Sequence, residues 1–145
     1  MQRFRVHTPS FQCLEDVTVQ VDEAVRRSGV QEGVCHLFVP HTTAGLIVNE
    51  NADPGLWRDF IEKLEALLPH DAPYHHNEPN GHAHLKSSLV GHSATLPVSG
   101  GRLALGRWQA VFVAEFDGPR EREVWLTLTA AAPAESAQRA ERATS

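Results

Sequence analysis

The alternation of apolar and polar positions predicts short strands along most of the chain. Polar and apolar residues alternate over 2–8, which is typical of a half-buried strand. An extended pattern resumes over 11–21, where valines occupy alternate positions towards the end of the segment. Further apolar runs predict strands over 33–39, 44–50, 95–98, 101–105, 108–116 and 123–130.

The connections between these strands carry turn signals. Segments 33–39 and 44–50 lie close in sequence, so we expect them to pair as a hairpin. Ser99-Gly100-Gly101 supplies the residues of a tight turn and predicts a second hairpin. Asp117-Gly118-Pro119 joins the last two strands.

One segment has a clear helical pattern. Over 54–68, apolar side chains recur at the spacing of one helix face and charged side chains occupy the other. Asp53 is placed to cap this helix, and Pro54 suits its first position. We therefore expect Trp57 and Phe60 to belong to the core.

Shorter helices are expected over 22–27 and 83–90, and the polar segment 70–82 between helices is interpreted as a surface loop. This mixture of strands and few helices predicts a mainly antiparallel α+β fold. We expect a single domain over 1–130, followed by a small, polar, low-complexity tail over 131–145.

Composition narrows the classes of function. The net charge is −5, and no basic cluster exceeds the Arg26-Arg27 pair, so the chain lacks the footprint of a nucleic-acid-binding protein. Cys13 and Cys35 stand in no metal-binding spacing and are expected to be free thiols. The sequence shows no signal peptide and no apolar run of membrane-spanning length, so a cytoplasmic protein with no membrane partner is expected.

Some polar side chains call for an explanation beyond turns and caps. Glu115 shares a strand face with Val111 and Val113, so a carboxylate there needs a partner. Two histidines with a carboxylate are typical of a site for zinc or a similar ion, and equally of a general acid/base set; both interpretations stay open. The side chains with this character are His41, Glu50, His84, Lys86 and Glu115.

Several familiar motifs are missing from the sequence. It has no GxGxxG after a strand, no GxxxxGK[ST] loop and no GxSxG elbow, so no nucleotide cofactor is expected. His75 and His76 lie next to each other in the polar loop, and adjacent loop histidines bind metals weakly and unselectively. We assign no role to them, nor to His82 and His92.

Three segments, HTTAGLIVNENADP, AHLKSSLVG and LPVSGGRLALGRWQAVFVAEFDG, resemble signature segments of the YjbQ-like family, known as secondary thiamine-phosphate synthase enzymes. The resemblance extends to Ala130, with the segments in the family's order. It implies a small α+β fold built around a β-sandwich, usually a homotrimer. It also implies a weak ability to join hydroxymethylpyrimidine diphosphate to a thiazole phosphate, which yields thiamine phosphate and releases pyrophosphate.

The resemblance also indicates site residues. Catalytic roles fall on His41, Glu50, His84 and Lys86. A divalent ion, zinc or magnesium, is the candidate cofactor, with His41, His84 and Glu115 as its ligands. Asp53, Gly106 and Trp108 also match, and Trp108 is interpreted as a core residue. Contacts to a small phosphorylated substrate fall on Thr42, Thr43, Asn49, Asn51, Ser87 and Gln109.

Few cations lie near these motifs for a diphosphate substrate. The alternative to an enzyme is therefore a trimeric protein that binds a metal or a small ligand and whose synthase activity is incidental.

Overall fold

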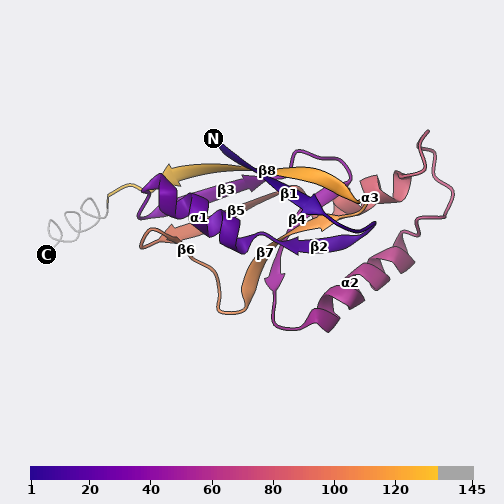
Figure 1. Ribbon diagram of the computed structural model, residues 1–145, viewed down its shortest axis with the longest axis horizontal. Helices are drawn as coiled ribbons and strands as arrows, with labels where there is room; N and C mark the ends of the chain where they lie inside the picture. Colours follow the sequence, from indigo (N-terminus) through magenta and orange to yellow (C-terminus); the bar gives the residue numbers. More distant parts are fainter. Residues whose placement is uncertain (134–145) are drawn as a thin grey trace, which may run out of the picture.

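The computed structural model describes residues 1–133, and positions 134–145 of the predicted tail lie outside the described residues. Figure 1 shows the elements in space, with the main helix α2 at one end of the molecule. In chain order the elements are β1 (Gln2–Thr8), β2 (Cys13–Asp16), α1 (Thr18–Ser28), β3 (Gly33–Phe38), β4 (Ala44–Glu50), α2 (Pro54–Leu67), α3 (Gly81–Val90), β5 (Ser93–Ser99), β6 (Arg102–Leu103), β7 (Gln109–Glu115) and β8 (Arg120–Ala130).

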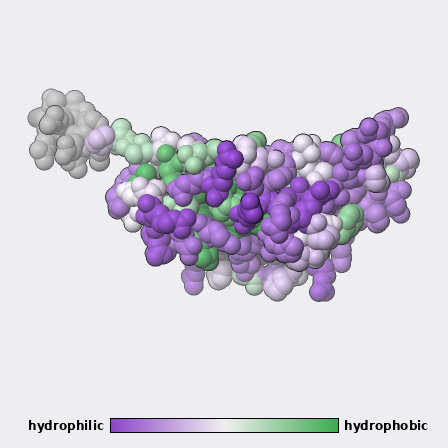
Figure 2. Space-filling view, turned by 45° about the horizontal axis from the view of Figure 1, so that its top comes forward, coloured by the Kyte–Doolittle hydropathy of each residue, from purple (hydrophilic) through white to green (hydrophobic). Residues whose placement is uncertain are grey.

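The strands form two antiparallel sheets. One sheet has the order β1-β8-β3-β5-β6 and the other has the order β2-β7-β4. Alternate side chains of both sheets point inward and form the main core together with one face of α1. The predicted mainly antiparallel α+β fold is confirmed. On the face shown in Figure 2, hydrophobic side chains gather over the half that carries α1, and the end with α2 and α3 is mostly hydrophilic.

One predicted hairpin is wrong and the other is confirmed. β3 pairs with β5 and β8, whereas β4 pairs with β7 in the other sheet. Both edges of β3 are thus taken, and the segment 39–43 carries the chain from one sheet to the other. β5 and β6 do form a hairpin, because Gly100 and Gly101 adopt positive φ values of 60° and 74° at the turn.

The helix α1 replaces part of the strand expected over 11–21. Val17, Val21 and Val25 are each at most 1% exposed and are spaced by four, whereas Val19 is 67% exposed. The alternation of valines fitted a strand, but packing of every fourth residue against the sheets decided for a helix. The carboxylate of Asp16 accepts a hydrogen bond from the backbone of this helix's first residue.

The helix α2 has the predicted extent, and Asp53 caps it by accepting a hydrogen bond from Gly55 N at 2.9 Å. The predicted core placement of Trp57 and Phe60 holds only in part: within Pro54–Leu67 no side chain is fully buried, but Phe60 packs against the small hydrophobic cluster of Ala83, Ala114 and Phe116. Trp57 lies against Phe112, with ring centroids 4.5 Å apart, on the outer side of the three-stranded sheet. The helix therefore covers part of the outer side of this sheet with half-buried side chains.

The helix α3 begins at Gly81, earlier than predicted, and packs on β4. A Cβ at Gly45 would lie 2.7 Å from Gly91 O and 2.8 Å from a methyl carbon of Val90, so only glycine allows this close approach. Cys13 and Cys35 are free, as predicted. Within residues 1–133, no helix has both the length and the apolar character needed to span a membrane.

Candidate functional site

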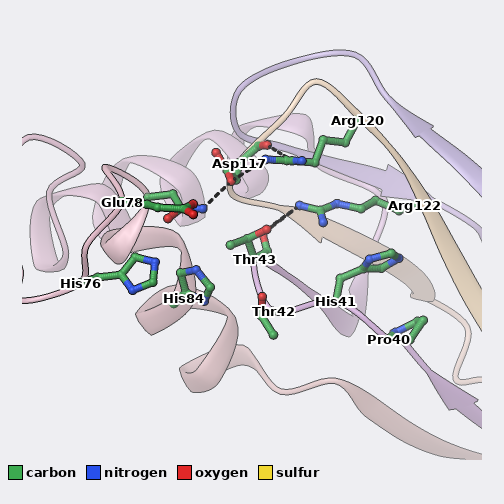
Figure 3. A pocket seen from close by; sticks show the side chains of 11 residues that line it. Pro40, His41, Thr42, Thr43, His76, Glu78, His84, Asp117, Arg120 and Arg122 are labelled. Carbon is green, nitrogen blue, oxygen red and sulfur yellow. Dashed lines mark hydrogen bonds and ion pairs between the residues drawn. The ribbon is translucent and has the colours of Figure 1, made fainter.

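A pocket of about 420 Å³ opens where three chain connections meet (Figure 3). The link between β3 and β4 forms one wall, the loop before α3 forms another, and the turn between β7 and β8 completes it. All of its lining residues except Pro40 are polar. The lining residues are Pro40, His41, Thr42, Thr43, His76, Glu78, Asn80, His84, Asp117, Arg120 and Arg122.

His41 follows Pro40 at the end of β3 and is held by the backbone of β8. Its Nε2 accepts a hydrogen bond from Glu123 N at 2.9 Å. Neutral His41 must therefore carry its proton on Nδ1, which is left as a donor. Burial, with the nearby Arg122 charge as the next cause, lowers the pKa of His41. The ring is accordingly a neutral hydrogen-bond donor at neutral pH.

Below the pocket wall lies a buried ion pair. Arg122 is 4% exposed, and its Nε and Nη2 donate to the two carboxylate oxygens of Glu115, which is fully buried. Thr8 Oγ1 and Asp117 N also donate to this carboxylate, at 2.6 and 3.0 Å. These hydrogen bonds to the charged form hold the pKa of Glu115 low against the effect of burial. Thr43 Oγ1 accepts from Arg122 Nη2 at 2.8 Å.

A second pair closes the pocket next to the β7–β8 turn. Arg120 Nη2 and Asn80 Nδ2 both donate to Oδ2 of Asp117, at 3.0 and 2.9 Å. On the opposite side the rings of His76 and His84 pack with centroids 4.6 Å apart. The loop before α3 thereby contributes directly to the pocket, although no role was predicted for its histidines.

The structure brings His41, His84, Thr42 and Thr43 to this pocket, but it places Lys86 elsewhere. Lys86 is fully buried, and its ammonium group donates to Glu65 Oε2 at 2.5 Å, to His82 Nδ1 at 2.8 Å and to Gln12 Oε1 at 3.1 Å. All three of its N–H groups are used. Lys86 thus joins α3 to α2 and to the β1–β2 connection and does not line this pocket, so its catalytic role stays a prediction.

Ser87 also does not line the pocket and instead has a structural role. It is buried, and its hydroxyl donates to the carbonyl oxygens of Thr42 and His84, at 2.5 and 3.2 Å. This bond ties α3 to the β3–β4 link, so it fixes the position of His84 relative to His41.

The remaining predicted contacts lie at the far end of β4. Glu50 pairs in register with Gln109, whereas Ala44 pairs with Glu115 near the pocket. A strand rises about 3.3 Å per residue, so this end is about 20 Å from the pocket within one chain. Asn49 is exposed next to Glu50.

At that end of β4 the polar side chains form hydrogen bonds with neighbouring protein groups. Asn51 donates to Asp16, and Gln109 Oε1 accepts from Gly106 N at 2.8 Å. Trp108 is 59% exposed, so its predicted place in the core is wrong. It lies in the turn directly before β7 and outside the buried part of that strand.

The proposed metal ligands do not converge in the described chain. Glu115 already accepts four hydrogen bonds and has no free lone pair for an ion. Within residues 1–133, no group of three or more His, Cys, Asp or Glu side chains is arranged to hold a metal. His41 and His84 line the same pocket, but His41 Nε2 already accepts a hydrogen bond from Glu123 N, so an ion bound by these two histidines stays a prediction.

Sequence reasoning missed the two arginines of the pocket. Arg122 shares the inward face of β8 with Val124 and Leu126, both buried. A charge on an apolar strand face is the same signal that identified Glu115, and it could have identified Arg122. No comparable signal marks Arg120, which lies on an exposed strand end.

The family model described as UPF0047 protein YjbQ-like matches residues 2–131. The chain belongs to this family. The YjbQ-like chain is 43% identical over 126 residues to the UPF0047 protein MJ1081 of Methanocaldococcus jannaschii. The matched segment covers 87% of this chain and 91% of that protein.

Two solved structures share the YjbQ-like fold. A conserved hypothetical protein, TT1486 of Thermus thermophilus, is 47% identical with a TM-score of 0.83, over 89% of this chain and 100% of that one. An uncharacterized YjbQ/UPF0047 protein of Clostridium acetobutylicum is 41% identical with a TM-score of 0.86, also over 89% and 100%. None of these names gives a reaction.

The stability of this YjbQ-like chain is expected to fall as the pH is lowered from 7 to 5. Burial and the charge of Lys86 lower the pKa of His82, and burial lowers that of His41. In this range the unfolded chain binds protons that the folded chain excludes, so protonation favours unfolding. Urea unfolding at pH 7, 6 and 5 measures the effect.

His82→Asn is the matched control, because the amide oxygen of asparagine can still accept from Lys86 but does not titrate. This variant should lose less stability between pH 7 and 5 than the parent does. Equal losses in the two proteins would remove His82 as a source of the pH dependence.

Proposed function

We propose that this pocket binds a small phosphorylated molecule and that the protein is a transferase of the thiamine-phosphate synthase kind. The observation that carries the proposal is the convergence of His41, His84 and two arginines in one polar pocket. A volume of about 420 Å³ is within the range of pockets that enclose small ligands. The family resemblance of the sequence supplies the reaction.

In that reaction a thiazole nitrogen attacks the methylene carbon of hydroxymethylpyrimidine diphosphate. The new C–N bond forms as the C–O bond breaks, and its electron pair leaves with pyrophosphate. Such a step needs fixed donors for the leaving group more than it needs a protein nucleophile. The Nδ1–H of His41 and the pocket arginines are donors of this kind.

The purified protein is expected to make thiamine phosphate from the two precursors, and His84→Ala is expected to lower kcat/KM by about tenfold or more. His84 lines the pocket on α3, so its removal takes away a polar group without disturbing the buried pairs. A coupled assay that detects thiamine phosphate measures the loss. His36→Ala, an exposed histidine on β3, is the control. Activity within threefold of the parent in His84→Ala would show that this pocket is not catalytic.

We also propose a homotrimer, as the resemblance implies. The exposed apolar side chains support it, above all Leu67 on α2 and Leu89 on α3, which are 68% and 64% exposed. A site shared between subunits would also bring the far end of β4 of one copy to the pocket of another.

The activity of Glu50→Gln distinguishes a site that lies within one subunit from a site that two subunits share. Glu50 lies about 20 Å from the pocket of its own chain, so a site within one subunit predicts unchanged activity. A loss of tenfold or more, with the fold intact, would instead place Glu50 of one subunit at the pocket of another. Light scattering on the same sample should give about three times the 16.0 kDa mass of one chain. A monomer of concentration-independent mass would remove both the trimer and the shared site.

The binding-protein alternative is favoured by one observation. Lys86, the cation that the sequence offered for a leaving diphosphate, is buried with three protein partners outside the pocket. If turnover is absent while phosphate or zinc still raises the melting temperature, the pocket binds a ligand and the synthase reaction is not its function.

A further inference from the structure

Arg122 is a buried guanidinium with one side left open. Its Nε and Nη2 are held by Glu115, and Nη2 also donates to Thr43. For Nη1, no hydrogen-bond partner exists within residues 1–133. Nη1 is not fully enclosed by protein atoms, so it reaches the pocket that Arg122 lines.

Such an arrangement is unusual for a buried charge that serves structure alone. Buried polar groups are nearly always hydrogen-bonded, and a guanidinium carries five N–H donors. Here Nε and Nη2 are paired, while Nη1 has no partner within residues 1–133 and is not fully enclosed at the pocket wall. In Figure 3 the guanidinium of Arg122 lies close to Thr43 and His41, on the side of the pocket away from His76 and Glu78.

We propose that Nη1 of Arg122 and Nδ1–H of His41 form the oxyanion-binding pair of this pocket, with a phosphoryl oxygen of the ligand as acceptor. Glu115 and Thr43 are its positioning residues, because they fix the plane of the guanidinium. The identification of the anion as the phosphate of a substrate rests on the proposed function. The binding pair itself rests on the geometry of Arg122 and His41.

The chemistry of the pair favours a phosphoryl group held by directed hydrogen bonds. Glu115 balances the charge of Arg122 and Asp117 balances that of Arg120, and Glu78 also lines the pocket, so the pocket offers no net positive charge. A planar guanidinium fixed on one edge presents its remaining donors in a set direction, which a lysine ammonium cannot do. The closeness of the Arg122 charge also helps to keep His41 neutral, and so a donor through Nδ1.

Titration of the full chain with inorganic pyrophosphate and with phosphate at pH 7 tests the pair. The unaltered protein is expected to bind pyrophosphate saturably, and Arg122→Lys is expected to weaken binding by about tenfold, because lysine keeps the charge beside Glu115 but loses Nη1. Arg102→Lys is the matched control, since Arg102 is exposed and pairs with Asp22 outside the pocket. Its affinity should stay within twofold of the parent. No saturable binding by the parent, or equal affinities in the parent and Arg122→Lys, would overturn the proposal.

Two further readouts keep the test decisive if Arg122→Lys does not fold. In the unaltered chain, side-chain ¹⁵N resonances of Arg122 should shift when pyrophosphate is added, and unchanged resonances would overturn the proposal. For positioning, Thr43→Val should weaken pyrophosphate binding and Thr43→Ser should restore it, because serine retains the acceptor for Nη2. Weakening by both variants alike would reduce Thr43 to a packing residue and remove its positioning role.

The outcomes separate the two proposals. Binding of pyrophosphate that depends on Arg122, without synthesis of thiamine phosphate, leaves the oxyanion pair in place and removes the proposed reaction. Synthesis that proceeds while Arg122→Lys binds pyrophosphate normally removes the oxyanion pair alone.

Discussion

Replacement of Glu115 by alanine is expected to lower the free energy of unfolding by about 3–5 kcal/mol. Arg122 would then be a guanidinium only 4% exposed and without its counter-charge, and Asp117 N would lose its acceptor. Most domains are stable by only about 5–15 kcal/mol, so this one change would remove a large share of the total. Urea unfolding at pH 7 measures it.

The double variant Glu115→Leu with Arg122→Met is the informative control for that measurement. Replacing a buried ion pair by apolar side chains of similar size is often neutral for stability, whereas removing one partner is not. The double variant should therefore recover most of the loss but should no longer bind pyrophosphate. A loss below about 1 kcal/mol in Glu115→Ala would mean that water reaches the pair and solvates Arg122.

The sequence already carried the signal for this pair. A carboxylate on an apolar strand face needs a partner, and that reasoning located Glu115 as a buried group. The partner was not predicted, because Arg122 lies on a strand of the other sheet and the packing of two sheets cannot be read from one strand. His41 was singled out for similar reasons, but its tautomer depends on Glu123 N, which only the fold brings near.

The errors in the fold have the same origin. Valines at 17, 19 and 21 fit a strand period, and valines at 17, 21 and 25 fit a helix, so the local pattern was ambiguous until packing decided. The pairing of β3 with β8 joins segments far apart in sequence, whereas the predicted hairpin joined neighbours. Local patterns thus predicted the elements well and their partners less well.

The candidate site was predicted in part. Residues of the HTTAG segment and His84 reach one pocket, while Glu50, Asn51 and Gln109 lie at the other end of β4. Their closeness in sequence to His41 suggested one site, but an extended strand separates its two ends as far as a chain of that length allows. Only assembly of several copies could reunite them.

Lys86→Met is expected to lower the free energy of unfolding by about 1–3 kcal/mol while leaving pyrophosphate binding within twofold of the parent. Methionine fills most of the space of the lysine stem but leaves Glu65, His82 and Gln12 without its three hydrogen bonds. Glu65 is 27% exposed and keeps its bonds from the neighbouring loop, so the loss should be smaller than for Glu115.

Hydrogen exchange distinguishes this structural role from a catalytic one. The Lys86–Glu65 contact attaches α2 to α3 in addition to the packing of Phe60 and Leu64, so amides of α2 should exchange faster in Lys86→Met. Lys63→Met is the control, because Lys63 is an exposed lysine on the same helix. If Lys86→Met instead abolished thiamine phosphate synthesis while stability and α2 protection were unchanged, Lys86 would act in a catalytic site, as the sequence predicted.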